Sequence, residues 1–123
     1  MKILNIIENN FQSTISDNNI VIVDCWASWC PACKDFNPIY EKVSIDNKDI
    51  LFCKIDASQE KDLISKLAVE NIPTLLLYKE GILIFKQAGY FDESKLSDIL
   101  DQVRNLDMDL VRADIEKNQS ENG

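Results

Sequence analysis

The sequence predicts a single α/β domain in which helices cover both faces of a central mixed β-sheet. Along most of the chain, short apolar runs typical of strands alternate with longer segments of helical period. This alternation is typical of parallel strands joined by right-handed helical crossovers. Near residue 80, one tight turn separates two strand-like runs, which adds an antiparallel pair. The length of 123 residues fits one domain.

The first part of the chain predicts a strand, a short helix and a buried strand. Residues 3–7 form the first expected strand, and Asn9 or Asn10 can cap the helix that follows. Residues 20–23 are a continuous β-branched run, which is typical of a central strand buried on both faces. This strand continues into Asp24, a carboxylate at a position where the pattern requires an apolar residue.

The middle of the chain predicts two helices with a strand between them. One helix is expected to begin at Pro31, because proline suits the first turn, and its apolar stripe consists of Phe36, Ile39, Tyr40 and Val43. Residues 50–55 form the strand. The second helix is marked by Leu63, Ile64, Leu67 and Ala68.

The last part predicts a hairpin and a final helix. Strands at residues 74–78 and 82–85 are joined by a turn at Glu80-Gly81, and the helix carries Leu96, Ile99, Leu100, Val103 and Leu106. Beyond Leu106 the amphipathic pattern weakens. We therefore expect a domain at residues 1–106 and an acidic extension at 107–123, helical to about Lys117 and then disordered. The extension is most simply a fraying helix end, and a docking segment for a partner is the alternative.

Charge and hydropathy exclude several classes of partner. With 21 acidic and 13 basic residues, the net charge is −8, and no basic patch is present. We therefore expect neither nucleic acid nor an anionic membrane as a partner. Asn5 and Glu8 interrupt the apolar run near the start, and no run has the length of a membrane span. These features predict a cytoplasmic protein.

The residues available for chemistry are few. The chain has no histidine, which removes most zinc enzymes and the Ser-His-Asp and Cys-His nucleophile pairs. It has four cysteines, Cys25, Cys30, Cys33 and Cys53, which should be reduced at rest in a protein without an export signal.

The motif Cys30-Pro31-Ala32-Cys33 follows the buried strand and opens a helix. The first turn of a helix has free N–H groups and the positive end of the helix dipole, and both stabilise a thiolate. Cys30 should therefore have a lowered pKa and act as a nucleophile. Cys33 lies three residues on, on the same helix face, from which it can attack a mixed disulfide formed at Cys30.

A metal site is the alternative interpretation of the cysteines. A structural zinc ion needs four ligands, and without histidine the other two would have to be Cys25 and Cys53. Both lie within predicted strands beside a large apolar residue, Trp26 or Phe52, where cysteine is typical of a core. We therefore expect a redox pair and no metal.

From residue 23 to residue 34 the chain resembles thioredoxin, and further landmarks follow in the family's order: Pro38, Ile72-Pro73-Thr74, Gly81 and Gly89. The resemblance covers residues 1–106 and implies the thioredoxin fold and thiol-disulfide exchange. It implies that Cys30 is the nucleophile, that Cys33 resolves the mixed disulfide, and that Asp24 is a buried acid that assists proton transfer. No cofactor is implied beyond the redox-active disulfide.

The resemblance also implies a substrate groove and two departures from the family. Pro73 matches the family's cis-proline, and the apolar docking groove would consist of Trp29, Pro31, Ile72, Pro73 and Gly89. The Pro-Ala pair between the cysteines replaces the usual Gly-Pro. An alignment of the third strand places Phe52 where many thioredoxins have a lysine near the buried acid, so that Asp24 would lack its cation.

The sequence thus predicts a monomeric, cytoplasmic protein disulfide reductase. Its expected partners are disulfide-containing proteins and a thioredoxin reductase that recycles the Cys30–Cys33 disulfide. Two alternatives stay open. One is an exchange enzyme of the isomerase type, and the other is a partner-binding module whose thiols are incidental.

Overall fold

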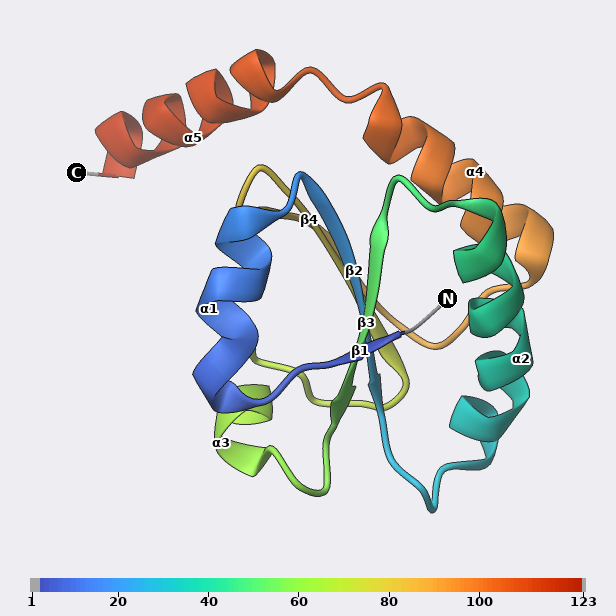
Figure 1. The fold of residues 1–123 in the computed structure, drawn as a ribbon. Helices are drawn as coiled ribbons and strands as arrows, with labels where there is room; N and C mark the ends of the chain where they lie inside the picture. The colour runs from blue at the N-terminus through green and yellow to red at the C-terminus, as the bar shows by residue number, and fades with distance from the viewer. Residues whose placement is uncertain (1–2, 123) are drawn as a thin grey trace.

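The fold is a five-stranded mixed sheet between two layers of helices (Figure 1). A computed structural model describes residues 3–122. The strand order is β1-β3-β2-β4-β5, in which β1, β2 and β3 are parallel to one another, β4 is antiparallel to β2, and β5 is antiparallel to β4. Helices α1 and α3 cover one face of the sheet, and α2 and α4 cover the other. The predicted fold class is confirmed.

The elements follow the predicted order. The strands are β1 (Leu4–Asn5), β2 (Ile20–Trp26), β3 (Leu51–Asp56), β4 (Thr74–Lys79) and β5 (Ile82–Ala88). The helices are α1 (Glu8–Asp17), α2 (Pro31–Asp46), α3 (Lys61–Lys66), α4 (Glu93–Arg104) and α5 (Met108–Asn122).

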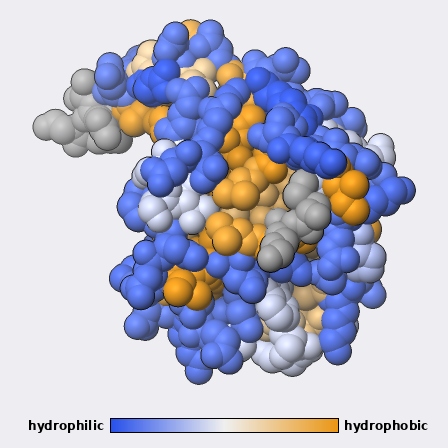
Figure 2. Space-filling view, in the orientation of Figure 1, coloured by the Kyte–Doolittle hydropathy of each residue, from blue (hydrophilic) through white to orange (hydrophobic). Residues whose placement is uncertain are grey.

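Strand β2 separates two apolar cores. Its alternate side chains point to opposite faces, so that Ile22 packs with α2 and α4, whereas Val23 packs with α1 and α3. Both side chains are completely buried, as the continuous β-branched run predicts. In Figure 2, most of the visible surface is hydrophilic, and apolar groups gather between the two helical layers.

The start of α1 differs from the prediction that Asn9 or Asn10 caps the helix. The residue at the N-cap is Ile7, and the helix begins at Glu8. Asn10 still takes part, because its Oδ1 accepts a hydrogen bond from the backbone N–H of Ile7 at 2.8 Å. The asparagine thus stabilises the first turn from inside the helix, and β1 is shortened to two residues.

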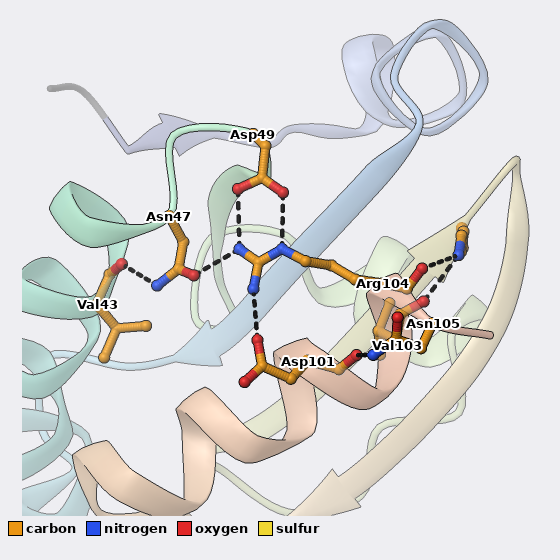
Figure 3. A network of polar contacts seen from close by, with 8 residues as sticks. Val43, Asn47, Asp49, Asp101, Val103, Arg104 and Asn105 are labelled. Carbon is orange, nitrogen blue, oxygen red and sulfur yellow. Dashed lines mark hydrogen bonds and ion pairs between the residues drawn. The ribbon is translucent and has the colours of Figure 1, made fainter.

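Polar side chains fix the end of α4 to the rest of the domain (Figure 3). Arg104 binds both carboxylate oxygens of Asp49, at 2.7 and 2.8 Å, and also Asp101 at 2.9 Å. Lys79 is buried, and its Nζ donates to the backbone carbonyl oxygens of Val103, Arg104 and Leu106 at 2.8 to 3.0 Å. These bonds satisfy carbonyl groups that a helix end leaves without partners.

The C-terminal extension is helical over a longer stretch than the sequence predicts. Helix α5 runs to Asn122, beyond Lys117. Met108, at its start, is buried, and Arg112 pairs with Glu80 at 2.7 Å beside the hairpin turn. The division at Leu106 stays a prediction. Among the described residues, no helix has the combination of length and apolar character that crossing a membrane requires.

Deletion of residues 114–123 should leave the melting temperature nearly unchanged. The side chains of residues 112–118 are all exposed, so this segment buries little apolar area to offset its ordering entropy. Met108→Ala is the matched control, because truncation of a buried methionine costs about 2–5 kcal/mol and should lower the melting temperature by several degrees. A truncated chain that melts as early as the control would show that the extension is structural.

Candidate active site

The candidate site lies where β2 ends and α2 begins. Trp26 is the last residue of the strand, and Pro31 is the first residue of the helix. The connection is a tight turn in which the backbone N–H of Cys30 donates to the carbonyl oxygen of Ala27 at 3.2 Å. The short connection after the central buried strand therefore places Cys30 at the N-terminus of a helix.

Cys30 and Cys33 form a disulfide, with their Cα atoms 5.2 Å apart. Cys30 is the N-cap of α2, and its Sγ accepts a hydrogen bond from the backbone N–H of Cys33 at 3.2 Å. Both residues are 4% exposed, so solvent access does not distinguish them. The hydrogen bond to Cys30 Sγ distinguishes the two cysteines, because a helix-end N–H that points at a sulfur stabilises the negative charge of a thiolate.

The other two cysteines lie apart from this pair. Cys25 and Cys53 are buried in the apolar core beside α1 and α3, and neither forms a disulfide. Burial raises the pKa of each thiol to about 12, so both are unreactive at neutral pH. In the part of the chain that the structure describes, no cluster of three or more cysteines and carboxylates forms that would hold a metal ion.

Asp24 is buried within β2 and lines a pocket of about 410 Å³ together with Cys33. Its Oδ1 has no hydrogen-bond partner among the described residues. Loss of solvent raises the pKa of Asp24 from 3.8 to about 7, although the positive charge of Lys54 lowers it in part. A carboxyl group with this pKa can take up and release a proton at neutral pH.

The prediction that Asp24 lacks a neighbouring cation is wrong. The parallel register of β2 and β3 places Ile22 beside Phe52 and therefore Asp24 beside Lys54. Lys54 lines the same pocket, and its Nζ lies 5.5 Å from the centre of the Trp26 ring. The sequence alignment placed the position beside Asp24 at Phe52, two residues before Lys54. A single sequence does not show which residues of two neighbouring strands pair, so it does not fix the register.

The predicted groove residues have different surroundings. The Ile72–Pro73 peptide bond is cis, and Ile72 packs against the apolar cluster that contains both cysteines of the motif. Trp29 is 69% exposed beside the motif, and Pro31 is exposed as well. Gly89 is exposed, has φ +94°, and donates its N–H to the carbonyl oxygen of Pro73 at 2.8 Å.

Ile72 offers backbone groups for docking. It lies outside the strands, and among the described residues neither its N–H nor its carbonyl group makes a backbone hydrogen bond. Ile72 therefore has free backbone groups next to the disulfide. An extended chain segment can pair with such groups.

Comparisons with known proteins agree with this geometry. The sequence model of the Thioredoxin family matches residues 2–120. A thioredoxin-type relative from Streptomyces coelicolor is 39% identical over 116 residues, which cover 94% of this chain and 87% of the relative.

Solved structures of thioredoxins are similar as well. A thioredoxin from Plasmodium falciparum superimposes with a TM-score of 0.76 at 30% identity, covering 81% of this chain and 98% of the other. A mutant thioredoxin from Halobacterium salinarum superimposes with a TM-score of 0.79 at 28% identity, covering 86% of this chain and 94% of the other. With its Cys30–Cys33 disulfide at the head of α2, the chain belongs to the thioredoxin family of thiol-disulfide oxidoreductases.

Proposed function

We propose that the chain reduces disulfide bonds of other proteins through Cys30 as the nucleophile and Cys33 as the resolving residue. The observation that carries this assignment is the hydrogen bond from the Cys33 backbone N–H to Cys30 Sγ, whereas no donor among the described residues binds the Cys33 sulfur. In the reduced protein the same N–H and the helix dipole favour the thiolate form of Cys30.

The first step is attack of the Cys30 thiolate on one sulfur of the substrate disulfide. A bond forms between Cys30 Sγ and that sulfur, the substrate S–S bond breaks, and the other substrate sulfur leaves as a thiolate. The exposed Trp29 and Pro31 and the free backbone groups of Ile72 surround this position and would hold an extended substrate segment.

The second step is attack of Cys33 on the mixed disulfide. Cys33 must lose its proton, and Asp24 is the acceptor because it lines the same pocket and has a pKa of about 7. The Cys33 thiolate forms the Cys30–Cys33 bond, and the second substrate sulfur leaves as a thiolate. Two electrons pass from the dithiol of this chain to the substrate disulfide.

The oxidised chain then needs an external two-electron donor. We assign the role of electron donor to a thioredoxin reductase, which reduces the Cys30–Cys33 disulfide to the dithiol. The family relationship supports this partner and disulfide-containing protein substrates. No cofactor other than the cysteine pair takes part in the proposed steps.

Single cysteine variants test the division of labour. Cys33→Ser should accumulate a covalent mixed disulfide with disulfide-bonded insulin as substrate, because Cys30 attacks but nothing resolves the product. Cys30→Ser should neither reduce insulin nor trap it, since the remaining thiol lacks the helix-end N–H. Non-reducing electrophoresis and mass spectrometry identify the adduct.

Cys25→Ala is the matched control for these variants. It removes a buried thiol whose pKa is about 12 and should retain insulin reduction. Equal trapping by Cys30→Ser and Cys33→Ser would contradict the assignment. Full activity of either variant would also contradict the proposed function.

Asp24→Asn should slow resolution and stabilise the fold. At neutral pH we expect insulin reduction to fall roughly 100-fold or more, because the proton acceptor is lost. The folded-state pKa of about 7 exceeds the ordinary value of 3.8, so the charged carboxylate opposes folding. The cost is absent below pH 3.8, grows up to about pH 7, and is constant above it at roughly 4 kcal/mol.

Denaturant unfolding of the oxidised protein at several pH values checks this linkage. The variant should gain stability over the parent protein as the pH rises from 3.8 to about 7, with little difference below that interval. A stability difference that is the same at every pH would contradict the buried-acid account. Unchanged insulin reduction at every pH would remove Asp24 from the mechanism.

A further inference from the structure

Asn37 lies one helical turn after Cys33 and lines the same pocket as Asp24. Its Oδ1 accepts a hydrogen bond from Lys54 Nζ, and its Nδ2 donates to Glu41 Oε1 at 3.3 Å. The carboxylate of Glu41 therefore fixes the orientation of the amide, so that the carbonyl oxygen is the atom that faces the lysine.

The ammonium group of Lys54 is held by Asn37 on one side and by the face of Trp26 on the other. Its Nζ lies 5.5 Å from the centre of the Trp26 ring, within the range of a cation–π contact. Although Asp24 is the register neighbour of Lys54, the lysine Nζ bonds to Asn37, and Asp24 Oδ1 has no partner among the described residues. The lysine thus binds the amide and leaves the nearby carboxyl group unpaired.

Other groups around Asp24 do not take the place of this lysine. From α2, Cys33 and Lys34 line the pocket, and the Tyr40 hydroxyl donates its one hydrogen to the carbonyl oxygen of Cys53 at 2.6 Å. Lys34 is exposed to solvent, where its charge is screened.

The strands beside Asp24 complete its surroundings. Strand β4 places Leu75 beside it, and Cys25 is its neighbour along β2, with a thiol that stays protonated at neutral pH. Lys54 on β3 is therefore the half-buried cation whose position determines the electrostatic potential at the Asp24 carboxyl group.

We propose that Asn37 is a positioning residue, which holds the Lys54 ammonium group away from Asp24 and so lets Asp24 keep its proton up to neutral pH. The functional meaning rests on the proposed role of Asp24 as the proton acceptor for Cys33. The contact itself belongs to this chain's own side chains and does not depend on that role.

Asn37→Ala removes the acceptor, and the ammonium group then turns to the unpaired carboxylate. The pKa of Asp24 should fall by about one unit from its value of about 7, as an approaching opposite charge requires. Asn37→Asp keeps an acceptor for Lys54 and adds a negative charge to the pocket, so it should raise the pKa. The Asp24 carboxyl ¹³C shift, followed against pH in the oxidised protein, measures both changes without titration of the cysteine pair.

A cycle with Lys54→Gln shows whether Asn37 acts through the lysine. In the Lys54→Gln background, Asn37→Ala should leave the pKa of Asp24 unchanged, because no ammonium group remains to be released. Asn9→Ala, on the exposed face of α1 across the sheet, is the control and should change nothing in either background. The same fall in both backgrounds, a rise, or no change with Asn37→Ala overturns the proposal.

The pH profile of insulin reduction separates this inference from the proposed function. When the pKa of Asp24 falls, the lower limb of the profile should move to lower pH by the same amount. If the titration moves and the rate profile does not, the positioning by Asn37 stands and the role of Asp24 as proton acceptor fails.

Discussion

The arrangement on which the site depends is the direct passage from a buried strand into the first turn of a helix. Strand β2 is fixed from both faces by the two apolar cores, and it ends four residues before Cys30 becomes the N-cap of α2. The N–H of Cys33, which has no partner within the helix, therefore donates to Cys30 Sγ, and no additional side chain is needed to stabilise the sulfur. In the proposed mechanism, the reactivity of Cys30 arises from backbone geometry, so the packing of β2 and α2 supports the chemistry as well as the fold.

The same burial that fixes β2 isolates Asp24. A carboxyl group in the centre of a sheet loses its water, and this loss opposes its ionisation and the stability of the fold. The positive charge of Lys54 partly offsets this rise in the pKa of Asp24. Asn37 and Trp26 nevertheless keep the lysine from forming an ion pair with Asp24. The resulting acid is neither strongly ionised nor permanently protonated at neutral pH, which suits a group that exchanges a proton with Cys33.

The features that the sequence predicts well are local ones. The continuous run at residues 20–23, the proline at the start of α2 and the Glu80-Gly81 turn each reflect short-range preferences, and each has its expected place. The partners of Asn10, Lys54 and Lys79 were not predicted, because they depend on cap geometry, strand register and the position of a helix end. The groove residues could be named from the sequence, but their spatial arrangement could not. Ile72 reaches the cluster that contains Cys30 and Cys33 only through tertiary packing.

The most direct test of this account is the pKa of the Cys30 thiol in the reduced protein. The rate of alkylation by iodoacetamide, measured against pH and assigned to Cys30 by peptide mapping, reports the fraction of thiolate. The account predicts a pKa clearly below about 8.5, the value of a free cysteine, because the helix-end N–H and the dipole favour the charged form. A value at or above 8.5 would contradict the assignment of Cys30 as the activated nucleophile.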